Sequence, residues 1–118
     1  MIKVEEILAE LSSFTGTENY FKHQFGILYT DGVKYLAETC GAYWLIDVVG
    51  SYQCEQKVKN EPFQVFKLQF HDDHSAKLEI SNGNGNILAS QELEYTDFPL
   101  KEIVLWCIDN VVILPSEY

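Results

Sequence analysis

The residues best suited to chemistry are the three histidines and the carboxylates close to them in the sequence. His71, Asp72, Asp73 and His74 are consecutive, and they offer imidazole and carboxylate groups that zinc and other divalent ions bind. Consecutive residues in a tight turn rarely converge on one ion, and polar residues are typical of hairpin turns. We therefore expect a solvated turn here and no bound cofactor, with a metal site formed by His71, Asp73 and His74 as the weaker hypothesis.

His23 could form a general acid–base pair with Asp31 or Asp47 if the fold brings these side chains together. No serine or cysteine stands in a recognisable nucleophile motif beside it. Because many titratable side chains are purely structural, we favour a structural role for His23. An enzyme with a cleft between helices and sheet, using His23, Asp31 and Asp47, is the alternative function.

Aromatic residues are concentrated between positions 14 and 53. Half or more should lie in the core, because aromatic side chains bury the largest areas in a small domain. Tyr35, Tyr43 and Trp44 lie off the apolar stripes of the expected helices, so we expect them to be exposed, and tyrosine and tryptophan are enriched in binding hot spots. The expected binding residues are Asn19, His23, Asp31, Tyr35, Tyr43, Trp44 and Asp47.

The charge balance is strongly acidic. Eighteen aspartates and glutamates against eight lysines give a net charge of −10, and arginine is absent. Nucleic-acid binding depends on basic groups that neutralise phosphates, so this composition argues against it. The acidity fits solubility or attraction to a basic protein partner.

Three cysteines, Cys40, Cys54 and Cys107, are an odd number without CxxC spacing. We expect reduced, mostly buried thiols that behave as small apolar side chains. No apolar run approaches the roughly 20 residues that a membrane span needs, so no membrane association is expected. The first residues mix glutamates with apolar side chains and do not resemble a signal peptide, which favours a cytoplasmic location.

The first half of the chain has helical periodicity. Residues 2–11 and 42–53 each carry an apolar stripe, and a third stripe follows Thr30 and Asp31 as far as Gly41, a natural helix terminator. Residues 15–24 begin with capping-box spacing, which predicts a short helix. The polar residues before Pro62 mark the change from helical to extended pattern.

The second half alternates with a period of two. Asn82–Gly85 is the strongest hairpin signal, and Asp109-Asn110 suits a tight turn. Residues 103–108 are apolar on both faces, which predicts a strand covered on both sides, with a short buried helix as the alternative. The expected strands are residues 63–70, 76–81, 87–95, 103–108 and 111–114. The sequence predicts one α+β domain, residues 1–118, with an N-terminal helical layer packed on an antiparallel C-terminal β-meander of about five strands.

The strings GTENYFKHQ, LYTDGVKYLAE, GAYWLIDVV, YTDFPL and ILPSEY resemble a family of small bacterial proteins of unknown function, including cyanobacterial members. The resemblance covers nearly the whole chain, most specifically residues 15–53 and 95–118. It implies one domain in a bacterial cytoplasm, and no activity, cofactor or substrate. We therefore expect a small acidic interaction protein that uses its helical aromatic surface to bind a protein partner, a basic one or a second copy.

Overall fold

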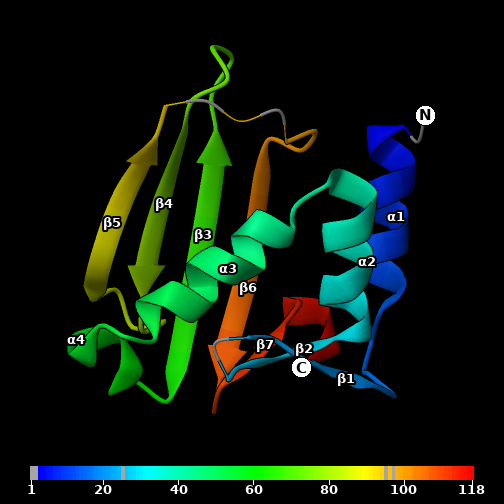
Figure 1. The fold of residues 1–118 in the computed structure, drawn as a ribbon. Helices are drawn as coiled ribbons and strands as arrows, with labels where there is room; N and C mark the ends of the chain where they lie inside the picture. Colours follow the sequence, from blue (N-terminus) through cyan, green and yellow to red (C-terminus); the bar gives the residue numbers. More distant parts are fainter. Residues whose placement is uncertain (1–2, 25, 95, 97) are drawn as a thin grey trace.

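The computed structural model describes residues 3–24, 26–94, 96 and 98–118. These residues form four α-helices, one 3₁₀ helix and a seven-stranded mixed sheet (Figure 1). The helices are α1 (Val4–Ser13), α2 (Asp31–Cys40), α3 (Tyr43–Tyr52), α4 (Gln56–Lys59) and the 3₁₀ helix η1 (Pro115–Glu117). The strands are β1 (Tyr20–Lys22), β2 (Leu28–Thr30), β3 (Phe63–Phe70), β4 (Ala76–Ser81), β5 (Ile87–Leu93), β6 (Glu102–Ile108) and β7 (Val111–Ile113).

The sheet has the strand order β1-β2-β7-β6-β3-β4-β5. The β2–β7 pair is parallel, and the other five strand pairs of the described residues are antiparallel: β1–β2, β7–β6, β6–β3, β3–β4 and β4–β5. Helix α3 crosses in front of β3 and β6, and α2 packs on β2 and β7 (Figure 1). The main core therefore lies between the helices and one face of the sheet. None of the helices in the described ranges is long and apolar enough to cross a membrane.

The predicted α+β class is confirmed, but the predicted five-stranded antiparallel meander is wrong. The prediction fails at two places: residues 20–30 form a β1–β2 hairpin in place of the short helix, and β6 pairs with β3 and not with β5, which a meander would require. Phe21 pairs with Tyr29 in this hairpin, their rings 5.5 Å apart, and Lys34 of α2 lies over the Phe21 ring. Strand pairing with β7 and these contacts outweigh a weak local preference for helix.

The other predicted elements are confirmed within a few residues of their expected bounds. Thr30 caps α2 by accepting a hydrogen bond from the backbone N–H of Val33, and Gly41 ends the helix in the left-handed conformation. Asp109 and Asn110 both have positive φ, as a tight two-residue hairpin turn requires. Ile2, Tyr95 and Asp97, which fall in a predicted helix, strand and connection, lie outside the described residues.

A pair of buried amides joins the helices to the sheet. Gln53, after α3, and Gln64 of β3 exchange side-chain hydrogen bonds of 2.7 and 3.1 Å. The Gln64 amide also donates to the carbonyl oxygens of Val58 and Glu61. Because buried polar groups are costly unless they are hydrogen-bonded, this network specifies where α3 and α4 sit on β3.

The C-terminal segment is hydrogen-bonded to the N-terminus of α2 through Glu117. The Glu117 carboxylate accepts hydrogen bonds from the Thr30 hydroxyl at 2.5 Å, the Gly32 backbone N–H at 3.1 Å and the Leu114 backbone N–H at 2.9 Å. A Cβ at position 32 would lie 2.6 Å from Leu114, so glycine is needed for this close approach. A carboxylate at a helix N-terminus also interacts favourably with the helix dipole.

Glu117→Ala should lower the free energy of unfolding by about 2–3 kcal/mol, because three donors lose a charged acceptor. Glu117→Gln, which keeps a neutral acceptor, should cause a smaller loss. Urea denaturation measures both. Glu92→Ala, on exposed β5, is the control and should change stability by less than about 0.5 kcal/mol. Equal stability of the Glu117→Ala protein and the wild type would contradict this account.

The three cysteines differ in burial more than we expect from the sequence. All three are free thiols, but Cys107 is buried, Cys40 is half-buried and Cys54 is exposed, so the expectation of mostly buried thiols is wrong for Cys54. Burial raises the pKa of the Cys40 thiol, and it raises the pKa of the Cys107 thiol to about 12. Since the thiolate is the reactive form, the three should differ in reactivity.

Iodoacetamide at pH 8 should therefore modify Cys54 first, Cys40 more slowly, and Cys107 only after unfolding. Mass spectrometry of peptides taken over a time course gives the three rates. In guanidinium chloride the rates should become similar, because the environments are lost. Modification of Cys107 in the folded protein at the rate of Cys54 would contradict the assignment.

Candidate functional site

Asn19 and Asp31 lie together beside the N-terminus of α2. The Asp31 carboxylate accepts hydrogen bonds from the Glu18 backbone N–H at 3.0 Å and the Asn19 side-chain amide at 3.2 Å. The Glu18 contact is the main cause that lowers the pKa of Asp31 below its ordinary value. The Thr17 hydroxyl accepts a bond from the Asp31 backbone N–H. These contacts fasten the loop before β1 to α2.

His23 and Asp47 form a second, separate pair. Nε2 of His23, in the turn after β1, lies 2.6 Å from Oδ1 of Asp47 on α3. The His23 side chain is only 9% exposed and the Asp47 side chain 53%. A carboxylate that orients an imidazole is part of many acid–base sites and also of many structural contacts. Asp31 makes its contacts with the loop before β1, so the acid–base hypothesis now rests on the His23–Asp47 pair and stays a prediction.

The aromatic side chains of the helices are mostly engaged with the core. Tyr35 packs against Phe14 with ring centroids 5.6 Å apart, and Trp44 meets Phe98 edge-on at 6.4 Å. Tyr43 is 43% exposed. The helical surface that the sequence predicts as a binding surface therefore presents Tyr43 openly and the other two only in part.

In the turn after β3, polar side chains form hydrogen bonds within the turn. Asp73 accepts hydrogen bonds from the backbone and hydroxyl of Ser75, at 3.0 and 2.6 Å, and the hydroxyl contact is the main cause that lowers the pKa of Asp73. His74 has a left-handed backbone with φ 69°. In the part of the chain that the structure describes, no three histidine, cysteine, aspartate or glutamate side chains are placed to hold a metal ion. His71, Asp73 and His74 thus form a turn.

An apolar surface lies on the face of the sheet opposite the helices. Side chains alternate along a strand, and Phe66 and Leu68 of β3 are buried beneath the helices. Phe63 and Val65 therefore point to the opposite face, where they are half-buried. In the described ranges, no helix or strand forms a second layer on this face.

The strand register places these residues in rows across the sheet. One row joins Phe63 to Ile108 and Val111, and the next joins Val65 to Trp106 and Ile113. Leu28 of β2 extends the first row beside Val111. In the second row, Ser81 of β4 lies between Val65 and Ile87 of β5. This surface, the sheet patch, consists of Leu28, Phe63, Val65, Ile87, Trp106, Ile108, Val111, Ile113 and Tyr118.

Three aromatic rings form the centre of the sheet patch. The Phe63 and Trp106 ring centroids are 5.0 Å apart, and Tyr118 lies 5.6 Å from Trp106 and 6.5 Å from Phe63. Tyr118 is 79% exposed. Clusters of exposed tryptophan and tyrosine are typical of binding hot spots.

The other half of the same face is polar, and four of its charged side chains form two ion pairs. Lys67 lies 3.8 Å from Glu102, and Lys77 lies 3.4 Å from Glu79. The face therefore divides into an apolar half, near the β6–β7 turn, and a polar half, near the opposite strand ends.

Sequence reasoning missed the sheet patch. The pattern of β6, apolar on both faces, predicts a strand covered on both sides, but only Leu105 and Cys107 are buried beneath the helices. Val104, Trp106 and Ile108 are half-buried on the uncovered side. The apolar residues are visible in the sequence, but only the layer arrangement shows that no second layer of helices or strands in the described ranges covers them.

Comparison with known proteins identifies one matching family. Residues 5–118 match a family of unknown function (DUF6876). No curated protein and no solved structure matches the chain. The expected membership of a family of unknown function is confirmed, whereas the expected bacterial setting stays a prediction. Because the match covers nearly the whole chain, this protein belongs to the family of unknown function DUF6876.

Proposed function

We propose that this protein is an interaction protein that binds a second copy of itself through the uncovered face of its sheet. The observation that carries the proposal is the half-exposed cluster of Phe63, Trp106 and Tyr118 at the centre of the sheet patch. Large contiguous apolar patches are uncommon on monomeric proteins and mark interaction sites. The proposal keeps the binding function expected from the sequence and moves it from the helices to the sheet.

The size of the face fits a dimer. Strands are about 4.8 Å apart and same-face residues about 6.8 Å apart, so the two apolar rows and the two polar rows beside them, about four strands each, span roughly 19 by 27 Å, or about 500 Å². Two such faces would bury about 1,000 Å², the area from which a specific interface becomes plausible. Two sheets packed face to face at about 10 Å would interdigitate their apolar side chains.

The charge distribution favours a second copy as the occupant. Each chain carries a net charge of −10, so most surfaces of two copies repel each other. The face holds two lysines and three glutamates, a net charge of −1: Lys67, Lys77, Glu79, Glu92 and Glu102. Repulsion is therefore small on this face, and a two-fold axis would let lysines of one copy meet glutamates of the other.

Sedimentation equilibrium should find a dimer at micromolar concentration. Trp106→Thr should raise the dissociation constant about 1,000-fold, because a hot-spot side chain contributes about 2 kcal/mol and occurs twice in a symmetric dimer. Val65→Lys should also raise the dissociation constant of the dimer. Ser90→Lys, on the polar half of the same face, is the matched control, and its dissociation constant should stay within a few-fold of the wild-type value.

Salt concentration separates this dimer from a complex with a basic partner. An apolar interface should persist in 1 M NaCl, where charge attraction is screened. A wild-type protein that stays monomeric at 100 µM or above would refute the proposal. A dimer that dissociates in salt, or that tolerates Trp106→Thr unchanged, would also refute it.

A further inference from the structure

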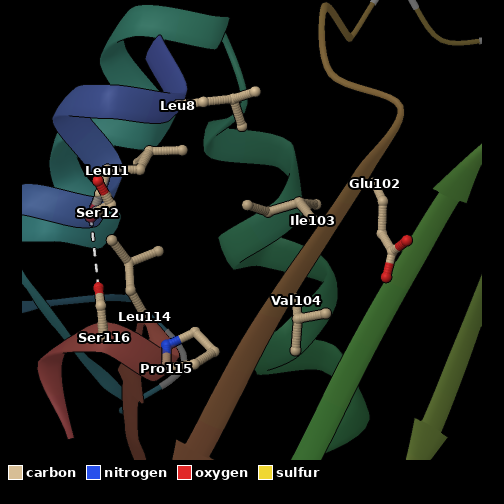
Figure 2. A pocket seen from close by; sticks show the side chains of 9 residues that line it. All are labelled: Leu8, Leu11, Ser12, Glu102, Ile103, Val104, Leu114, Pro115 and Ser116. Carbon is tan, nitrogen blue, oxygen red and sulfur yellow. Dashed lines mark hydrogen bonds between the residues drawn. The ribbon is translucent and has the colours of Figure 1, made fainter. Parts of the chain in front are cut away.

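A second apolar feature is a cleft between α1, the beginning of β6 and η1. Figure 2 shows Leu8 and Leu11 on the α1 side and Ile103 and Val104 on the β6 side. The cleft has a volume of about 390 Å³, which is within the range of about 300–1,000 Å³ for ligand sites. Its lining residues are Leu8, Leu11, Ser12, Glu102, Ile103, Val104, Leu114, Pro115 and Ser116.

One wall of the cleft is an unpaired strand edge. β6 pairs with β3 over Glu102–Ile108, but β7 covers its other side only at residues 106–108. In the described part of the chain, no strand pairs with residues 102–105 on the cleft side. Open edges of this kind can accept an added strand.

The hairpin turn determines which backbone groups face the cleft. A two-residue turn at Asp109-Asn110 makes Ile108 and Val111 a hydrogen-bonded pair, and alternate residues of β6 then point the same way. Glu102 and Val104 therefore direct their N–H and C=O groups toward the cleft. The Lys101 carbonyl accepts a bond from the Phe70 N–H on the opposite side, which fits this alternation.

The chain itself turns away where β7 would have continued. β7 ends at Ile113, and the Leu114 backbone N–H donates to Glu117 instead of to a strand. Pro115 follows, and proline has no N–H to offer a ladder. The Ser116 hydroxyl then bonds the Leu11 carbonyl on α1, the dashed line in Figure 2. The cleft thus lies on the line along which another strand would extend β7.

We infer that this cleft binds an extended peptide segment, which adds a strand to β6 at residues 102–105. Main-chain bonds to Glu102 and Val104 would hold it, and apolar side chains would enter between Leu8 and Ile103. Glu5 lies on the same helical face as Leu8, and Glu102 stands at the other wall, where its one ion pair is the long, half-exposed contact with Lys67 at 3.8 Å. We therefore expect the segment to carry basic flanking residues. This inference is independent of the proposed dimer.

A labelled, capped peptide of alternating valine and threonine with a lysine at each end is a suitable probe. Fluorescence anisotropy should show saturable binding to the wild-type protein. Glutamates in place of the end lysines should weaken binding at least tenfold. N-methylation of alternate peptide nitrogens, which blocks strand pairing, should abolish it.

Leu8→Glu tests the apolar wall, and this side chain is 50% exposed, so the fold should tolerate the change. It should weaken peptide binding at least tenfold. Ala9→Glu adds the same charge to the same helix outside the cleft lining and should have little effect. Circular dichroism verifies that both variants are folded.

Hydrogen exchange gives an independent readout. The peptide should protect the amides of Glu102 and Val104 and leave Ile103, already paired with β3, unchanged. Absence of binding by the wild type, equal binding of the N-methylated peptide, or binding without protection at Glu102 and Val104 would each overturn the inference. Binding to the Leu8→Glu variant as tight as to the wild type would also overturn it.

Discussion

The placement of the Glu117 carboxylate at the N-terminus of α2 is the contact on which both exposed surfaces depend. It accepts bonds from Thr30, Gly32 and Leu114, and so joins the C-terminal segment to the first helical turn and to β2. The neighbours of Glu117 are positioned as a result: Ser116 reaches α1, and Tyr118 lies beside Trp106 on the far face of the sheet. A carboxylate with three donors and a favourable helix dipole is a strong anchor.

Three of the five motifs that resemble a known family lie around this contact. GTENY supplies Thr17 and Asn19, LYTDG supplies Thr30 and Asp31, and the closing LPSEY supplies Glu117. Each polar side chain there bonds to another part of the same cluster. These three motifs therefore stabilise the fold, while the surfaces that we propose for binding consist mainly of apolar strand and helix residues.

The sequence predicted much of the local structure and part of the polar chemistry. The helix that starts at Asp31 and the hairpin turns follow from local patterns. For His23 the sequence left Asp31 and Asp47 open as partners, and the tertiary structure places Asp47 beside it. The short helix at residues 15–24 was wrong because Tyr20–Lys22 is stabilised by strand pairing with β2, which a window of sequence does not show. The exposed aromatic surface was placed on the helices, since periodicity does not reveal which faces Phe14 and Phe98 cover.

By itself, the sequence determined the class of the fold, the acidic balance, the absence of arginine and the apolar character of β6. Only the tertiary structure decided that α2 and α3 cover one face of the sheet, and that no helix or strand in the described ranges forms a layer over Trp106 on the other face, so that Trp106 stays half-buried. It also decided that β7 is too short to cover the edge of β6 at Glu102 and Val104. The physical reason is that alternation reports which residues share a face, whereas burial depends on the elements that pack against that face.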